Sequence, residues 1–438
     1  MGKTPMDVLC NFLSMQNELQ ISTRGIQMPE SPIRKLAPLA YQAEDEGVKI
    51  YRLNIGQPDL STPQKALDAL KNVDRSTLEY SPSQGYRSLR KALVNYYERY
   101  QIKLSADDII VTCGGSEAVL FAFMSCLNPG DEIIVPEPAY ANYMSFAISA
   151  GAVIRTVTTT IEEGFCLPKV EKFEELINER TKAILICNPN NPTGYLYTQR
   201  EMNQIRDLVK KYNLYLFSDE VYREFIYTGS PYISAMHLDG IEQNVILIDS
   251  VSKRYSECGI RIGALITKNE AVRKTVMKFC QARLSPPLIG QIVAEASIEG
   301  TEAYSREVYE EYLERRKTLI DGVNRIPGCY TPIPMGAFYT VAKLPVDDAE
   351  KFCAWCLSDF RYKDEKTAGM KPSGHNPEVK AETIMMAPAA GFYTTPDLGK
   401  NQVRLAYVLC KEDIQRALMI LEKAIEEYNQ LHDNYEKI

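Results

Sequence analysis

Short runs of apolar residues alternate with amphipathic stretches along the middle of the chain. Runs of this length, nearly continuous in Ile, Val and Leu, are typical of strands buried on both faces. They cover residues 108–113, 132–136, 181–187, 214–218 and 245–249. The stretches between them show helical spacing of apolar residues, as in 201–212. This alternation predicts an α/β domain with a mainly parallel sheet, in which ligands bind just beyond the strand ends.

The pattern changes near residue 304. Residues 304–325 predict a long, charged amphipathic helix, followed by a strand pair after Gly336 and a final helix over 411–431. We therefore expect a smaller α+β domain here, joined by the N-terminal segment before Gly56. The expected division is a large domain at 58–303 and a small domain made of 1–57 and 304–438.

A polar stretch at 359–383, containing Gly, Pro, Lys and Glu, is typical of an insertion. A solvated loop is favoured here over a lid that closes on a substrate. The sequence does not show what such a loop would cover.

The composition narrows the classes of function. With 438 residues and 45% hydrophobic content, the chain is long enough for one large or two medium domains. A net charge of −7 without a long basic block argues against a nucleic-acid surface. No apolar run approaches about 20 residues, and the first residues lack a charged-then-apolar leader. We therefore expect a cytoplasmic protein without membrane spans.

Neither the cysteines nor the histidines indicate a metal site or a hydrolase. The eleven cysteines have no regular spacing, so a disulfide framework is not expected. Cys353 and Cys356 share one face of a predicted helix, where apolar packing is favoured over metal binding or redox chemistry. The three histidines lie outside any recognisable catalytic pattern. They are His237, His375 and His432.

Lys253 is the most informative candidate for chemistry. It lies just past the apolar run at 245–249, and Arg261 follows eight residues later. A desolvated amine beside another cation has a lowered pKa, which a nucleophilic lysine needs because a free lysine titrates near about 10.4. For a lone lysine, an exposed loop position would be the more common explanation. The surrounding motifs favour the nucleophile.

Nine short motifs follow one another along the chain, from about residue 33 to the final helix, in the order that a known enzyme family shows. The chain resembles the fold-type I pyridoxal-phosphate enzymes, specifically class I and II aminotransferases, and is nearest in style to aspartate aminotransferases. The resemblance rests on Asn54-Ile-Gly56-Gln-Pro-Asp, Tyr80-Ser-Pro-Ser-Gln-Gly85, Gly114-Gly-Ser-Glu-Ala118, Pro138-Ala-Tyr140, Asn188-Pro-Asn-Asn191-Pro-Thr-Gly194, Asp219-Glu-Val-Tyr222, Ser250-Val-Ser-Lys253, Arg261 and Val403-Arg404-Leu.

The glycine-rich turn after 108–113 is a candidate phosphate site. Gly115, Ser116 and Glu117 open a predicted helix, whose first N–H groups and dipole favour an anion. The turn matches neither a Walker loop nor a dinucleotide fingerprint. By itself it is a weak signal, since two glycines after a strand are often only a turn. The resemblance adds Ser250 and Arg261 as further contacts to the phosphate of pyridoxal 5'-phosphate.

Other motif residues are expected to contact the ring of this cofactor. The resemblance implies that Asp219 keeps the ring nitrogen protonated, since a nearby carboxylate favours the cation. It also implies that Asn191 and Tyr222 bind the ring's phenolic oxygen and that Tyr140 stacks on the ring. The alternatives are a helix cap at Asp219, a plain turn at 188–194 and a core position for Tyr140.

The substrate is expected to bind between the two domains. By the resemblance, Arg404 grips the α-carboxylate, and Gly56 brings backbone close to the same group. A surface salt bridge is the alternative for Arg404. Tyr80 resembles the tyrosine that reaches the phosphate from the partner subunit, which implies a homodimer with a shared active site.

The resemblance implies ping-pong transfer of an amino group, with Lys253 as the Schiff-base lysine that moves the proton at Cα. L-Aspartate with 2-oxoglutarate is our best guess for the substrates. Arg283, shortly before Pro-Pro, is a candidate for the distal carboxylate, although a structural role is at least as well supported. Alternatives are an alanine, aromatic or broad aminotransferase, a lyase or decarboxylase on this fold, and a non-catalytic cofactor-binding protein.

Overall fold

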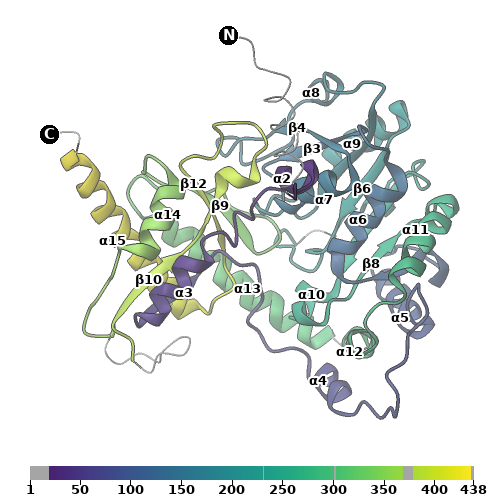
Figure 1. The fold of residues 1–438 in the computed structure, drawn as a ribbon, viewed down its shortest axis with the longest axis horizontal. Helices are drawn as coiled ribbons and strands as arrows, with labels where there is room; N and C mark the ends of the chain where they lie inside the picture. Colours follow the sequence, from purple (N-terminus) through teal and green to yellow (C-terminus); the bar gives the residue numbers. More distant parts are fainter. Residues whose placement is uncertain (1–18, 230, 300–301, 368–377, 436–438) are drawn as a thin grey trace, which may run out of the picture.

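A seven-stranded sheet forms the centre of the larger part of the molecule, on the right in Figure 1. The computed structural model describes residues 19–229, 231–299, 302–367 and 378–435. Strand β8 runs antiparallel to both of its neighbours, and the other pairs of strands are parallel. The strands, in spatial order, are β2 (Ile109–Thr112), β8 (Gly263–Ile266), β7 (Val245–Ser250), β6 (Tyr215–Asp219), β5 (Thr181–Cys187), β3 (Glu132–Glu137) and β4 (Val153–Thr158). The predicted α/β class with a mainly parallel sheet is confirmed.

The five apolar runs became strands β2, β3, β5, β6 and β7, with ends shifted by no more than a residue or two. Two strands of this sheet were not predicted. Strand β4 lies at the edge, where alternate positions stay partly exposed and polar residues interrupt the apolar run. Strand β8 is only four residues long and follows directly on the Arg261 loop, so its pattern is too short to recognise.

Helices cover the sheet and place its loops. Helix α6 packs against strands β7 and β8 and against helices α7 and α11. Helix α9 begins with a capping box in which Thr198 and Glu201 exchange hydrogen bonds. The helices of this part are α4 (Gln64–Lys71), α5 (Arg87–Glu98), α6 (Gly114–Cys126), α7 (Asn142–Ala150), α8 (Val170–Glu174), α9 (Gln199–Tyr212), α10 (Val251–Arg254), α11 (Glu270–Arg283) and α12 (Leu288–Ile298).

The C-terminal part contains two further sheets. The expected strand pair is instead a three-stranded antiparallel sheet, in the order β11 (Ala387–Pro388), β12 (Gln402–Ala406), β9 (Tyr339–Lys343). A second sheet pairs β1 (Val48–Arg52) in parallel with β10 (Ala381–Met385). The helices here are α13 (Glu302–Val323), α14 (Ala349–Ser358) and α15 (Lys411–Tyr435), with α2 (Thr23–Gln27) and α3 (Ala37–Asp45) from the N-terminal segment.

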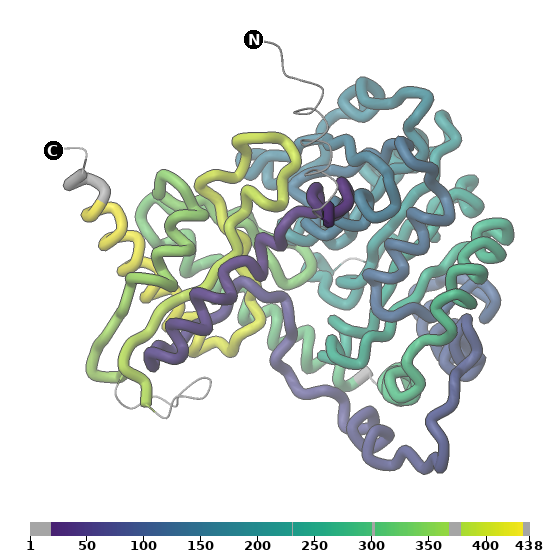
Figure 2. Tube along the Cα trace, in the orientation of Figure 1, coloured from purple at the N-terminus to yellow at the C-terminus, as the bar shows by residue number. Residues whose placement is uncertain are grey.

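The N-terminal segment crosses the molecule before it enters the main sheet. In Figure 2 its purple trace runs alongside the yellow-green C-terminal segments on the left and then turns back to the lower right of the view. The pairing of β1 with β10 and the packing of α3 against α14 hold it there. The N-terminal segment thus packs against the C-terminal part of the chain, and the division into two domains at 58 and 303 stays a prediction.

The insertion at 359–383 is described only in part, because residues 368–377 lie outside the described residues, as does His375. Its two edges meet at a polar cluster: Arg416 on α15 forms an ion pair with Asp364 at 2.6 Å. Thr367 Oγ1 donates to Glu382 at 2.8 Å, and Tyr51 OH donates to the same carboxylate at 2.8 Å. The described edges of the insertion are therefore anchored to α15 and β1.

The predicted packing role of the two neighbouring cysteines is confirmed. Cys353 and Cys356 are buried in the hydrophobic core on α14. Within the described ranges, no group of His, Cys, Asp and Glu side chains is arranged to hold a metal ion. Across the same ranges, no helix has the length and apolar character needed to cross a membrane.

Glu257 anchors the loop between Lys253 and Arg261 to helix α12. Its side chain is buried and accepts a hydrogen bond from Ser297 Oγ, while its second oxygen has no partner among the described residues. Burial raises the pKa of Glu257 to about 8, with Ser297 and Arg254 opposing the rise. The folded state therefore retains a proton that the unfolded chain releases at lower pH. This contribution to stability is full at acidic pH and is lost as pH rises towards 8.

We expect Glu257→Gln to stabilise the fold selectively at alkaline pH. A neutral amide avoids burying a charge, so the free energy of unfolding at about pH 8.5 should rise by roughly 1–3 kcal/mol over the wild type. At about pH 4 the difference should nearly vanish, since the carboxyl is then mostly neutral in both the folded and the unfolded chain. Urea unfolding at both pH values measures this, and an equal difference at both would contradict it.

Candidate active site

A cavity of about 700 Å³ lies at the carboxyl-terminal edge of the main sheet. Loops after β2, β3, β5, β6 and β7 contribute to its wall, together with the chain after β1 and strand β12. Strand β2 runs in the same direction as β7, because both are antiparallel to β8. All five of these loops therefore leave the sheet on one side, where open α/β sheets bind ligands.

Most of the residues predicted for the site line this one cavity. They are Gly56, Gly115, Ser116, Tyr140, Asn191, Asp219, Tyr222, Ser250, Lys253, Arg261 and Arg404. Three predicted residues, Tyr80, Glu117 and Arg283, do not line it in the described chain.

Lys253 projects into the cavity from α10. Its Nζ donates a hydrogen bond to the Gly56 carbonyl at 2.8 Å and lies 3.7 Å from Cys258 Sγ. Burial lowers the pKa of Lys253, and the charges of Arg404 and Arg261 add to the decrease, while Cys258 opposes it. A lowered pKa leaves more of the amine unprotonated, as a nucleophile requires.

The side chains that line the cavity carry an excess of positive charge. Arg34, Lys253, Arg261 and Arg404 face one carboxylate, that of Asp219. Within the described part of the chain, none of these four cations forms an ion pair with a carboxylate. The cavity is therefore suited to anionic groups.

Asp219 lies at the end of β6 and is almost completely buried. Tyr143 OH donates to its carboxylate at 2.6 Å, and the Val221 N–H donates at 3.3 Å. Burial raises the pKa of Asp219 to about 6, and the charges of Asp249 and Glu220 also raise it, while these two donors lower it. A cation placed against Asp219 would reverse much of this rise.

A hydrogen-bonded chain joins the main sheet to Arg404. Tyr222 OH lies 3.0 Å from Tyr339 OH and accepts from Asn191 Nδ2 at 3.2 Å. Arg404 Nη1 donates to Asn191 Oδ1 at 3.0 Å, and Nη2 donates to the Asn54 carbonyl. Arg404 Nε is buried and has no hydrogen-bond partner among the described residues. An unpaired guanidinium N–H in such a position indicates a missing anionic acceptor.

Close backbone contacts shape the opposite end of the cavity. A side chain on Gly263 would lie 2.5 Å from the Gly114 carbonyl carbon and 2.7 Å from the Asp249 oxygen, so only glycine fits there. This contact brings the start of α6, with the N–H groups of its first turn, next to Ser250 and the Arg261 loop. Free N–H groups, a hydroxyl and a guanidinium suit a phosphate group.

These features together fit pyridoxal phosphate. Ser250, Arg261 and the first turn of α6 supply donors suited to a phosphate, Lys253 supplies an amine, and Asp219 supplies a buried carboxylate. The hydrogen-bonded pair Asn191 and Tyr222 offers donors to a phenolic oxygen. The aromatic ring of Tyr140 lines the same cavity.

The three predicted residues that lie elsewhere have definite surroundings. Glu117 accepts from the Cys113 N–H at 2.8 Å and from Arg283 Nη1 at 2.8 Å. Arg283 Nη2 also donates to the Ser83 carbonyl at 2.9 Å. Within one chain Arg283 is thus held by Glu117, behind the glycine-rich turn. Tyr80 is 77% exposed, so its side chain is free to meet another molecule.

Sequence reasoning missed several residues of the cavity wall. Tyr143 follows the Tyr140 motif by less than one helical turn, and Tyr339 belongs to the Gly336-Ala-Phe-Tyr element, so both were close to recognised signals. Cys258 stands between Lys253 and Arg261 but matched no catalytic pattern. Arg34 precedes the first recognised motif, and nothing in its local sequence marks it as a cavity residue.

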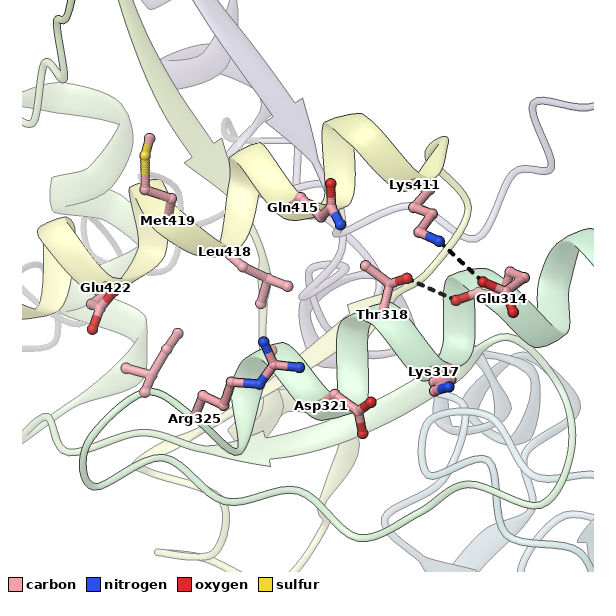
Figure 3. Close-up of a pocket in the computed structure, with 12 residues that line it drawn as sticks. Glu314, Lys317, Thr318, Asp321, Arg325, Lys411, Gln415, Leu418, Met419 and Glu422 are labelled. Atoms are coloured by element: carbon pink, nitrogen blue, oxygen red, sulfur yellow. Dashed lines mark hydrogen bonds and ion pairs between the residues drawn. The ribbon is translucent and has the colours of Figure 1, made fainter.

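A second cleft, of about 480 Å³, lies between α13 and α15 (Figure 3). Its rim carries an ion pair of Lys411 with Glu314 at 3.2 Å, and Thr318 Oγ1 donates to the Glu314 carbonyl at 2.9 Å. None of the predicted site residues lines this cleft, and its charged side chains alternate in sign. The cleft is therefore distinct from the candidate active site.

Comparison with known proteins agrees with this geometry. The sequence profile of the family "Aminotransferase class I and II" matches residues 48–362. An aspartate aminotransferase of Pyrococcus horikoshii is 30% identical over 418 residues, which cover 93% of this chain and 97% of that protein. The solved alanine aminotransferase of Pyrococcus furiosus has a TM-score of 0.81 at 29% identity, covering 93% of this chain and all of that one. The aspartate aminotransferase of Thermus thermophilus with maleate has a TM-score of 0.81 at 26% identity, with coverage of 93% and 100%. The chain therefore belongs to the class I and II aminotransferases.

Proposed function

We propose that this aminotransferase uses pyridoxal 5'-phosphate to move an amino group from an L-amino acid to 2-oxoglutarate by a ping-pong mechanism. The observation that carries the proposal is the amine of Lys253, whose pKa is lowered by burial, in a cavity that among the described residues is lined by three arginines and by one carboxylate, that of Asp219. L-Aspartate is our best guess for the donor. The Pyrococcus horikoshii relative is named an aspartate aminotransferase and the Pyrococcus furiosus structure an alanine aminotransferase, so the family alone does not decide the donor.

When bound, pyridoxal phosphate supplies a protonated ring that accepts the negative charge formed at Cα of the amino acid. We assign Asp219 to hold the proton on the ring nitrogen. Asn191 and Tyr222 donate hydrogen bonds to the phenolic oxygen, and Tyr140 stacks on the ring. Gly115, Ser116, Glu117, Ser250 and Arg261 form the phosphate end, Glu117 acting from behind the turn through the Cys113 N–H.

Lys253 and Arg404 act on the amino acid. Lys253 is assigned both to bind the cofactor and, as a free amine, to take the proton from Cα. Arg404 grips the α-carboxylate with the Nε that lacks a partner. Gly56 is assigned to bring backbone close to the same group, and its lack of a side chain lets the Tyr339 hydroxyl pack against it, since a Cβ there would lie 1.5 Å from that oxygen. The role of Arg283 at a distal carboxylate stays a prediction, and in one chain its guanidinium is engaged by Glu117.

Two other reactions remain as candidates within this proposal. An alanine, aromatic or broad-specificity aminotransferase would use the same residues with a different donor. A lyase or decarboxylase on this fold would form its product without consuming a keto acid. Measuring the stoichiometry of 2-oxoglutarate consumed per keto acid formed separates a lyase or decarboxylase from amino transfer, and a panel of amino donors separates the aminotransferases from one another.

We further propose a homodimer with a shared active site, in which the exposed Tyr80 of one subunit reaches the phosphate in the other. A hydroxyl donated to a phosphate oxygen is a charge-assisted hydrogen bond, and this requires Tyr80 to be exposed in the single chain.

We expect Lys253→Ala to abolish amino transfer while the protein stays folded, because no other amine replaces the lost nucleophile. Adding L-aspartate alone to the wild type should remove the visible absorption band of the bound cofactor, whereas the variant should not turn over. Lys103→Ala, which removes an exposed lysine, is the control. Appreciable turnover by Lys253→Ala would refute the assignment, and a band in the wild type unmoved by aspartate would discard aspartate as donor.

We expect the affinity for pyridoxal phosphate to depend on the protonation of Asp219. Above a pH of about 6 its carboxylate is charged and holds the cationic ring nitrogen; as pH falls through about 6 the charge is lost and binding weakens. Asp219→Asn should bind more weakly at neutral pH, by about 10–100-fold, and should lose this part of the pH dependence. Equilibrium titration of the cofactor at several pH values measures this. Parallel pH profiles for both proteins would contradict it.

Mixing two inactive variants tests the shared site. If Tyr80 acts on the partner's cofactor, random dimers of Lys253→Ala and Tyr80→Ala chains contain some sites with both native residues. In an equal mixture about half of the dimers contain both variants, and one of the two sites in each has both native residues. We therefore expect about a quarter of the wild-type activity per site. The assay is run at limiting cofactor, because Tyr80→Ala alone is impaired there. No recovery on mixing, together with a monomer in sedimentation equilibrium, would overturn the proposal.

A further inference from the structure

One cation in the active-site cavity has no role in the proposed chemistry. Of the four that line it, Lys253 is assigned to the cofactor and the proton, Arg261 to the phosphate and Arg404 to the α-carboxylate. Arg34 is left over. Its guanidinium forms no hydrogen bond or ion pair with any residue in the described ranges, and it lies near Ser31 and Ile33, which line the same cavity.

The backbone around Arg34 is tied to the carboxylate site. Asn54 Nδ2 donates to the Ile33 carbonyl at 3.0 Å, and the Asn54 carbonyl in turn accepts from Arg404 Nη2. Asn54 is 1% exposed, so this connection is a fixed part of the interior. The segment that carries Arg34 is therefore positioned by the same residue that positions Arg404.

The guanidinium groups of Arg34 and Arg404 both influence the pKa of the Tyr140 hydroxyl. Burial raises the pKa of Tyr140, and the charges of Arg404 and Arg34 both oppose that rise. Asn142 Nδ2 donates to the Tyr140 hydroxyl at 2.9 Å, so this side of the cavity is lined by donors and cations. A substrate held by Arg404 would extend into a region where a second negative charge is stabilised.

We propose that Arg34 binds the distal carboxylate of the substrate and so selects amino acids with an acidic side chain, and their keto acids, over neutral ones. The inference rests on the proposed aminotransferase function. Arg34 is well suited to it, because a guanidinium binds a carboxylate through two parallel hydrogen bonds and this one has no competing carboxylate among the described residues. Arg283, by contrast, already holds Glu117 at 2.8 Å.

The exposure of Arg34 fits a role in choosing the substrate rather than a role in stabilising the fold. The side chain is exposed in the single chain, so its removal leaves no buried group unpaired. The neighbouring Lys35 forms an ion pair with Glu350 away from the cavity and serves as a matched control.

The test compares holoenzyme carrying Arg34→Met, Arg34→Lys, Lys35→Met or Arg283→Leu with the wild type. We expect Arg34→Met to lower kcat/KM for L-aspartate and L-glutamate by about 10–100-fold, as the loss of a charged hydrogen-bonded pair predicts. The kcat/KM for L-alanine should change by less than about 3-fold, because in a ping-pong mechanism this ratio reports the alanine half-reaction and not the one with 2-oxoglutarate; an unchanged value also shows that the variant is folded. Arg34→Lys should retain part of the preference, and Lys35→Met all of it.

Inhibition by small acids gives a second measurement that is independent of turnover. Maleate, with two carboxylates, should bind Arg34→Met about 10–100-fold more weakly, whereas propionate, with one, should bind both proteins equally. O-Phosphoserine is included because a cation also holds a phosphate; a preference for it over aspartate that depends on Arg34 would overturn the choice of a carboxylate.

The outcomes separate this inference from the proposed function. If no amino acid is transaminated by the wild type, the proposed function fails. If the wild type transaminates but Arg34→Met loses aspartate and alanine activity equally, or keeps the wild-type preference, the role of Arg34 is refuted. A selective loss in Arg283→Leu with none in Arg34→Met would assign the distal carboxylate to Arg283.

Discussion

Electrostatic repulsion among cations that share one cavity is the constraint on which this site depends. Arg404 is almost fully buried, and its guanidinium lies 4.6 Å from the centre of the Tyr339 ring while it donates to Asn191 and Asn54. Burying such a charge without a counter-ion costs several kcal/mol, on the order of what a bound anion returns. The unpaired Nε marks where that anion belongs. We therefore expect anionic ligands to stabilise the folded protein by supplying the missing counter-ions.

A second buried network holds the loop that carries Lys253. Although burial opposes ionisation, Arg254 and Arg223 keep the pKa of Asp249 below its ordinary value. Tyr97 OH donates to the same carboxylate at 2.5 Å, and the Ser250 N–H donates at 2.8 Å. Here each charge has its partner, in contrast to the cavity on the other side of the loop. Removing one member would leave an uncompensated buried charge, so this network fixes the start of α10.

Sequence patterns predicted the strands correctly where the residue types of a segment reflect its position in the folded protein. The runs that became β3, β5, β6 and β7 are buried on both faces, so apolar character alone identified them. Strand β4 was missed because an edge strand keeps polar residues, and β1 because its partner β10 lies more than three hundred residues away. The motif residues after the strand ends were found, since each motif carries its own turn chemistry.

The sequence by itself determined the fold class, the family and the candidate residues that follow the strand ends, because these depend on contiguous patterns of apolar runs, glycines and turns. Only the tertiary structure decided which cations are free. Arg283 and Arg34 look alike in the sequence, yet one is held by Glu117 and the other lines the cavity without a partner among the described residues. That difference arises because the charge available to a ligand depends on neighbours brought together by folding, and distance along the chain does not encode them.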